Sequence, residues 1–191
     1  TDLKLHDGYY GATPQPFASV SEETYLPRGV GLPGLAWQRG RSVWLDGLAS
    51  SPKFLRSEAA GAVGIERGLA LPCPVPGRGH YVATLLASAA TPIATRIEAW
   101  GPDPAGAGLQ RIWGQCERSG VLPAGADART SGVGGDTISA AFASALPRIA
   151  QRASDEPGAV GAAAAAAGLG GLIALPVVDD GAVVETVVLY F

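Results

Sequence analysis

The chain has 191 residues, of which 47% are apolar, so a packed core is available and wholesale disorder is excluded. Its formal net charge is −3, only 16% of its residues are charged, and its basic residues do not cluster, which argues against a nucleic-acid-binding protein. The 27 glycines and 15 prolines predict many turns and short elements.

The first half of the chain predicts an alternation of strands and helices. In chain order these are a strand (3–10), a glycine-rich turn opening a helix (35–39), a helix between Ser51 and Gly64, and strands at 69–75, 81–87 and 95–100. Ser51 is a favourable N-cap, and Pro52 would occupy the first helical position, where proline is tolerated. Gly64 can end this helix in the left-handed conformation.

The second half predicts the same order of elements. These are a strand (109–116), a helix (138–146), a helix between Asp155 and Gly168, and strands at 172–178 and 183–191. The alanine run at 162–167 is expected to be helix interior, because alanine has the highest helix propensity; a low-complexity segment is the alternative. Asp180-Gly181 between β-branched runs predicts a hairpin.

The two halves also repeat each other in sequence. Residues 64–72 and 168–176 share Gly, Ala, Leu and Pro at a spacing of 104 residues, and Gly-Val-Gly at 29–31 recurs at 132–134. We interpret this as two copies of one unit. The hairpins imply antiparallel pairing, so the expected class is α+β, with a central antiparallel sheet and packed helices in each copy.

The predicted domain boundaries follow from this repeat. Domain 1 is expected at 1–101 and domain 2 at 109–191, joined by a Pro/Gly-rich linker at 102–108. The first copy ends in the strand at 95–100, which has no equivalent in the second. The second sheet is therefore expected to leave an edge unpaired or to borrow a strand from elsewhere.

This order of elements, with its motifs, resembles a tandem pair of GAF domains. The motifs that carry the resemblance in the first copy are residues 29–37, Gly40, 43–45, 54–56, Ala60, Gly64-Ile65 and 69–72. The second copy is more divergent: it keeps 132–134 and 168–176 but has Asp136-Thr137 in place of Pro-Gly and no Trp after Trp113. The resemblance implies a small-molecule-sensing or dimerising module of signalling proteins, with ligands between the sheet and the helix-and-loop face.

We therefore expect a non-catalytic sensor that binds a small molecule and relays ligand state through domain placement. A structural or dimerising pair without a ligand is the alternative, and a thiol enzyme at Cys73 or Cys116 is a third. The chain has no Asn, so it lacks the Asn-Lys motif of cyclic-nucleotide-binding members. Neither cysteine is followed by His, as in bilin-attaching members, and two cysteines argue against methionine sulfoxide reduction. Neither ligand nor cofactor can be named.

The sequence also makes predictions about setting and partners. The longest run of small apolar residues is too short to cross a bilayer, and the N-terminal residues show no signal-peptide pattern. The two cysteines form no Cys-x-x-Cys pair. We therefore expect a cytoplasmic protein with reduced thiols, no membrane or nucleic-acid partner, and a homodimer or further signalling domains as partners.

Candidate ligand-binding residues gather in the first copy. They are Trp37, Trp44, Phe54, Arg56, Cys73 and His80. The rings could line a cavity, with Arg56 or His80 as a polar handle; packing in the core is the alternative. Cys73, in a predicted buried strand, is expected to pack as a small hydrophobe. The alanine-rich second copy is expected to be a scaffold, to leave a dry void, or to allow close helix contact.

Three other motifs have simpler explanations. Residues 29–34 spell G-x-G-x-x-G, but Pro27 interrupts a preceding strand and Asp46 comes too early for a ribose-binding acid, so a tight turn is expected. The histidines and cysteines are too scattered for a zinc site, so no metal is predicted. The acidic pairs at 22–23 and 179–180 are expected in a solvated loop and a turn.

Overall fold

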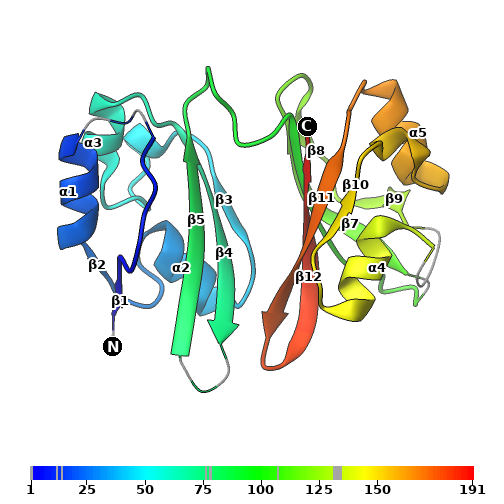
Figure 1. The fold of residues 1–191 in the computed structure, drawn as a ribbon, viewed down its shortest axis with the longest axis horizontal. Helices are drawn as coiled ribbons and strands as arrows, with labels where there is room; N and C mark the ends of the chain where they lie inside the picture. The colour runs from blue at the N-terminus through cyan, green and yellow to red at the C-terminus, as the bar shows by residue number, and fades with distance from the viewer. Residues whose placement is uncertain are drawn as a thin grey trace. The chain divides into compact units, whose positions relative to one another are not determined.

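The computed structural model describes residues 2–11, 13, 15–75, 77, 79–106, 108–130 and 135–191, and only the backbone of residues 126–128. The chain forms two compact units, unit 1 (Thr1–Ile93) and unit 2 (Ala94–Phe191). Each combines helices with antiparallel strands, in agreement with the predicted α+β class (Figure 1). None of the helices in these ranges has the length and apolar character needed to cross a bilayer.

Unit 1 is built on a three-stranded sheet. Its elements are β1 (Leu3–Lys4), α1 (Gln15–Glu23), β2 (Tyr25–Leu26), α2 (Gly31–Arg39), β3 (Val43–Leu45), η1 (Leu48–Ser50), α3 (Ser57–Ala62), β4 (Arg67–Val75) and β5 (Gly79–Ala87). The sheet has the order β3-β4-β5, and β1 pairs separately with β2. Helix α2 packs on β4 and β5. The core is closed by buried side chains from α1, α2 and the sheet, among them Phe17, Leu32 and Ala70.

Unit 2 has a larger sheet. Its elements are β6 (Arg96–Pro102), β7 (Leu109–Cys116), β8 (Gly120–Leu122), β9 (Gly125–Arg129), α4 (Thr137–Ser144), β10 (Arg148–Ala150), η2 (Ala153–Asp155), α5 (Gly158–Ala166), β11 (Leu172–Asp179) and β12 (Ala182–Tyr190). The order is β10-β11-β12-β6-β7-β8, with β9 also on β7. Helix α4 packs on β10, β11 and β12, while α5 packs on η2 and β9.

The sequence repeat corresponds to a repeat of structure. The order α2-β3-η1-α3-β4-β5 in unit 1 recurs as α4-β10-η2-α5-β11-β12 in unit 2. The strand register recurs as well: Ala70 lies opposite Val43 and Thr84, and Ala174 lies opposite Arg148 and Val188. Residues at the spacing of 104 therefore occupy equivalent places in the two sheets.

The predicted domain boundary and linker need correction. The strand expected at the end of the first copy is β6, which pairs with β12 and β7 in the sheet of unit 2, so the boundary falls between Ile93 and Ala94. The expected linker is a hairpin turn joining β6 to β7, closed by Asp103 N donating to Gly108 O at 2.9 Å. The Asp103 carboxylate is buried and 2.9 Å from Arg129 Nε. A Pro/Gly-rich stretch fits a tight turn as well as a linker, and β6 supplies the strand that the second sheet was expected to borrow.

Several local predictions are confirmed. Gly64 and Gly168 have φ of +70° and +61°, so both follow their helices in the left-handed conformation. The alanine run lies largely within α5, as expected from its helix propensity. The Asp180-Gly181 turn has positive φ at both residues and joins β11 to β12 in an antiparallel pair.

Other local predictions were wrong. The first strand covers only Leu3–Lys4, and α1 was not expected. Helix α3 begins at Ser57 with Arg56 as its N-cap, because Ser51 instead ends the short η1 turn. Asp155 likewise lies in η2, and Pro157 is the N-cap of α5. The repeated Gly-Val-Gly at 132–134 falls outside the described residues, as do Pro76 and Arg78 between β4 and β5.

Candidate functional site

The six predicted ligand-binding residues do not form one group. Two pairs are close: the rings of Trp37 and His80 have centroids 5.5 Å apart, and the Arg56 guanidinium carbon lies 5.2 Å from the Phe54 ring centroid. Trp44 lies on β3 opposite Leu69. Within the described residues, neither Trp44 nor Cys73 makes a ring contact or hydrogen bond to the other four.

Cys73 is exposed, so the expectation that it packs as a buried small hydrophobe was wrong. Burial along β4 covers Gly68–Pro72 and ends there. Strand β4 continues past the core toward β5. The hydrophobic run in the sequence does not show at which residue the strand stops being covered by the rest of unit 1. Phe54 is buried in the core of unit 1, as its packing alternative predicts.

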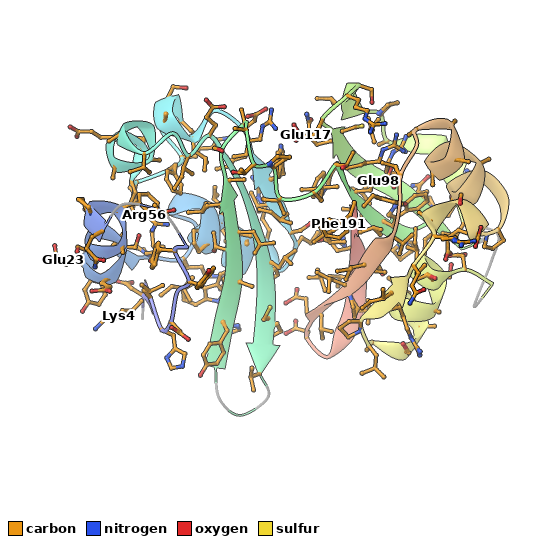
Figure 2. All side chains as sticks on the ribbon, turned by 45° about the horizontal axis from the view of Figure 1, so that its top comes forward. Lys4, Glu23, Arg56, Glu98, Glu117 and Phe191 are labelled. Carbon is orange, nitrogen blue, oxygen red and sulfur yellow. The ribbon has the colours of Figure 1, made fainter. Side chains whose placement is uncertain are left out.

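Arg56 has a structural explanation in unit 1. Its guanidinium carbon lies 5.1 Å and 5.2 Å from the ring centroids of Phe17 and Phe54, and its Nη1 donates a hydrogen bond to Ser21 Oγ. Burial lowers the pKa of Arg56, while Tyr10 acts in the opposite direction. Arginine over two rings is a favourable cation–π arrangement, and here it joins α1 to the start of α3 (Figure 2).

Unit 2 contains a cavity beside α5. It has a volume of about 140 Å³. Its lining residues come from the face of three strands and one side of the helix: Arg96, Glu98, Trp100, Arg111, Ala159, Val160, Ala163 and Tyr190. We call this the α5 cavity. None of these residues is among the six predicted for a ligand.

Strand geometry brings the polar lining residues together. Arg96, Glu98 and Trp100 alternate along β6, so their side chains share one face of the sheet. Tyr190 of β12 lies directly opposite Arg96. On the other side, a β-bulge between Ala99 and Trp100 places Arg111 of β7 opposite Trp100. Bulges commonly re-aim side chains in this way.

A buried carboxylate is the centre of this group. Glu98 is 2% exposed. Its Oε1 is 3.0 Å from Arg111 Nη1 and 3.8 Å from Arg96 Nη1. Its Oε2 accepts hydrogen bonds from Trp100 Nε1 at 3.0 Å and from the Tyr190 hydroxyl at 3.1 Å. We call these five residues the Glu98 cluster; Figure 2 labels Glu98 within unit 2.

The electrostatics of the Glu98 cluster follow from its burial. Burial and the neighbouring Glu98 carboxylate raise the pKa of Tyr190 well above its ordinary value, so the phenol remains a neutral donor. Two arginines and one glutamate leave an excess positive charge. A buried charge is costly unless it is compensated. A bound anion could compensate this excess positive charge.

The opposite side of the cavity is apolar and partly open. Ala159 and Ala163 lie one helical turn apart on α5, beside the buried Val160. Both alanines are exposed as well as lining the cavity, so this side of the cavity lies at the surface of unit 2. A larger side chain at either position would narrow the cavity on this side.

Cys116 is adjacent to the Glu98 cluster without lining the cavity. It lies opposite Arg96 on β7 and is 2% exposed. Burial acts to raise the pKa of Cys116, but hydrogen bonds from Ser119, from the backbone of Arg118 and from the Arg96 side chain outweigh it and lower the pKa to about 7.

The site was missed because its signal is weak in sequence. Arg96, Glu98 and Trp100 alternate, which is typical of a strand but does not show which face is buried. Placing Arg111 with them required knowledge of the bulge. The available signal is that Arg96 and Glu98 alternate with apolar residues along one strand. Charged side chains rarely enter a core without partners, so this pattern indicates a paired group if that face is buried.

Within the described ranges, no group of three or more His, Cys, Asp or Glu side chains is placed to hold a metal ion. No protein-family model matches the chain, and no curated protein matches its sequence at a significant level. The geometry of the α5 cavity is therefore the basis for an argument about function.

Proposed function

We propose that the protein is a non-catalytic, small-molecule-binding module built from two GAF-like units. The observation that carries this proposal is the α5 cavity, which combines buried polar groups with an apolar wall. Ligand sites commonly have this character: apolar surroundings with a few polar groups that fix orientation. A site of this kind between a sheet and a helix also fits the ligand position that the GAF resemblance implies.

The relay of a signal would follow from ligand burial. A ligand that prefers one arrangement of the two units shifts their populations toward it. We propose that occupancy of the α5 cavity biases the placement of unit 1 and unit 2 in this way, in the setting of a cytoplasmic signalling protein. The cavity itself lies within unit 2, so binding does not require both units.

A structural or dimerising module without a ligand is the second candidate. The specific observation in its favour is the cavity volume of about 140 Å³, because pockets for drug-sized ligands usually hold about 300–1,000 Å³. A module of this kind would show a concentration-dependent dimer and no ligand. The two candidate functions therefore differ in whether the purified protein carries a small molecule, which can be measured directly.

Native mass spectrometry of the full chain purified from its own host tests the proposal. We expect one small molecule per chain, released when the protein unfolds. A bare mass, together with no thermal stabilisation by a panel of small metabolites, would overturn ligand binding and favour the scaffold. Small-angle scattering with and without the released molecule tests the relay, and identical curves would remove it.

A further inference from the structure

The hydrogen-bonding capacity left in the Glu98 cluster is mainly that of donors. Both Glu98 oxygens already accept bonds, from Arg111 on one side and from Trp100 and Tyr190 on the other. Arg96 Nε is buried and has no hydrogen-bond partner among the described residues. A guanidinium has five N–H donors and no acceptor, so a ligand that complements this wall must supply acceptors.

The charge of the Glu98 cluster also favours an anionic ligand. Two guanidinium groups face one carboxylate, and the phenol of Tyr190 stays neutral. The further acid that acts on Tyr190 is Glu156, whose carboxylate is engaged by the backbone N–H and hydroxyl of Thr137 at 2.7 and 2.6 Å. The neighbouring Cys116 carries no charge while it is a thiol, so in that form one excess positive charge is available to a ligand, and a monovalent anion would balance it.

The size of the α5 cavity and the shape of the guanidinium groups further restrict which anion could bind. The cavity volume of about 140 Å³ corresponds to roughly four or five water molecules at about 30 Å³ each. A planar guanidinium matches a planar carboxylate through two parallel hydrogen bonds. The methyl groups of Ala159 and Ala163 and the side chain of Val160 form the opposite wall, which suits a short hydrocarbon tail.

From these observations we propose that the α5 cavity binds a short-chain monocarboxylate, with its carboxylate on Arg96 and Arg111 and its hydrocarbon end against α5. This inference rests on the proposed function and names its ligand class. Arg111 is held in place by its Nε donating to Pro123 O at 3.0 Å and by its pairing with Glu98. Arg96 also lines the cavity, and its Nη1 is 3.8 Å from Glu98 Oε1, so its guanidinium is less closely engaged by Glu98 than that of Arg111.

Calorimetric titration of the full chain with three probes tests the ligand class. The probes are propionate, the neutral propionamide of nearly the same shape, and inorganic phosphate, all at matched ionic strength. We expect saturable binding of one propionate per chain and no binding of propionamide over the same range. Phosphate is expected to bind more weakly, because it is tetrahedral and carries more charge than the cluster can balance.

Two substitutions locate the binding. Arg96→Gln removes this guanidinium and should raise the Kd for propionate at least about tenfold, while Arg96→Lys, which keeps the charge but loses the planar fork, should retain part of the affinity. Ala163→Leu places a larger side chain at the cavity and leaves every charge in place, so it should abolish propionate binding. Ala162→Leu is the matched control, because Ala162 is exposed on the same helix and does not line the cavity.

The outcomes separate this inference from the proposed function. Equal binding of propionamide, or preference for phosphate, would overturn the monocarboxylate while leaving a small-molecule site. Propionate binding that survives Ala163→Leu would place the site elsewhere and overturn the inference. Failure of all three probes overturns the ligand class, and only if the host-purified protein also carries no small molecule does the proposed function fail with it. If Arg96→Gln does not fold, the two alanine variants decide.

Discussion

Unit 1 and unit 2 share a repeated order of helices and strands but place buried or half-buried arginines in different surroundings. In unit 1, Arg56 lies over two aromatic rings and bonds to the Ser21 hydroxyl, and no ion pair to it occurs within the described residues. In unit 2, Arg96 and Arg111 share the buried Glu98. The two units therefore stabilise a buried or half-buried cation by two physical means, aromatic rings in unit 1 and a carboxylate in unit 2.

The packing around Arg56 differs from that around Arg96 and Arg111 because the neighbouring side chains differ in size. In unit 1 the side chain of Phe17 from α1 packs on Arg56. In unit 2 the α5 side chains beside Arg96 and Arg111 are Ala159, Val160 and Ala163, and a cavity remains there. Repetition of a fold thus preserves its elements and register, while the size of a few side chains decides whether the interior is filled.

The largest expected effect comes from removing the acid in unit 2. Glu98→Gln removes the charge that compensates the buried Arg96 and the half-buried Arg111, so we expect the free energy of unfolding to fall by about 3–5 kcal/mol. Urea denaturation measures this. The control is Glu58→Gln, at an exposed position on α3, which should change stability by less than about 0.5 kcal/mol. Equal stabilities would show that the Glu98 cluster is not a coupled ion-pair group.

The same Gly→Ala substitution in the equivalent helices α3 and α5 should change the free energy of unfolding in opposite directions. A Cβ at Gly161 in α5 would lie 1.8 Å from the backbone oxygen of Glu156, whereas at Gly61 in α3 its nearest neighbour is Ala49 Cβ at 3.4 Å. We expect Gly161→Ala to cost about 3 kcal/mol through overpacking. Gly61→Ala should stabilise unit 1 by about 0.5–1 kcal/mol, because alanine is the better helix former. Thermal denaturation of both variants compares them, and the expectation fails if both shift in the same direction.

The two cysteines should differ in their effect on pH dependence. The pKa of buried Cys116 is lowered to about 7 from an ordinary 9.0, so between pH 7 and 9 the unfolded chain binds more protons than the folded one. Stability should therefore increase with pH across this window, by about 2 kcal/mol. Cys116→Ala should remove this increase and Cys73→Ala should keep it. Thiolate absorbance provides an independent readout, and a titration midpoint near 9 for Cys116 would contradict the assignment.

The smallest effect concerns the starts of the equivalent helices α4 and α2. Asp136 caps α4, accepting from Ser139 N at 2.8 Å, whereas Val30 at the start of α2 provides no side-chain cap. Asp136→Ala should cost about 1 kcal/mol. Val30→Asp should gain only about 0.5 kcal/mol, since Pro33 has no N–H to offer the new carboxylate. Urea midpoints measure both, and a stabilising Asp136→Ala would show that the cap is not favourable.

Local signals in the sequence predicted much of the duplicated part of the fold. Hairpin residues such as Asp180-Gly181 and helix-ending glycines such as Gly64 act within a few residues, so their conformation can be inferred without the rest of the chain. The partner of β6 could not be inferred in this way. Its pairing with β12 joins distant segments, and the turn after it has the composition of a linker.

The candidate site was less predictable than the fold. The sequence identifies aromatic residues in unit 1, and the structure places Phe54 in the core there. The α5 cavity depends on a strand register, a bulge that turns Arg111, and the position of a helix with small side chains. Each of these is a tertiary relationship, which one-dimensional periodicity does not contain. The small residues of α5 were recognised, but the void beside them is lined by charges rather than dry and apolar.

The pairing of β6 with β12 also affects the order in which the chain acquires its structure. Arg96, near the beginning of unit 2, lies opposite Tyr190, near its end. During synthesis the sheet of unit 2 cannot close until β12 has left the ribosome, whereas the strands β3, β4 and β5 of unit 1 pair with close sequence neighbours. Long-range pairing is slow, and nascent chains generally fold from the N-terminus. We therefore expect unit 1 to fold first, while β6 can pair early with β7 but must wait for β12.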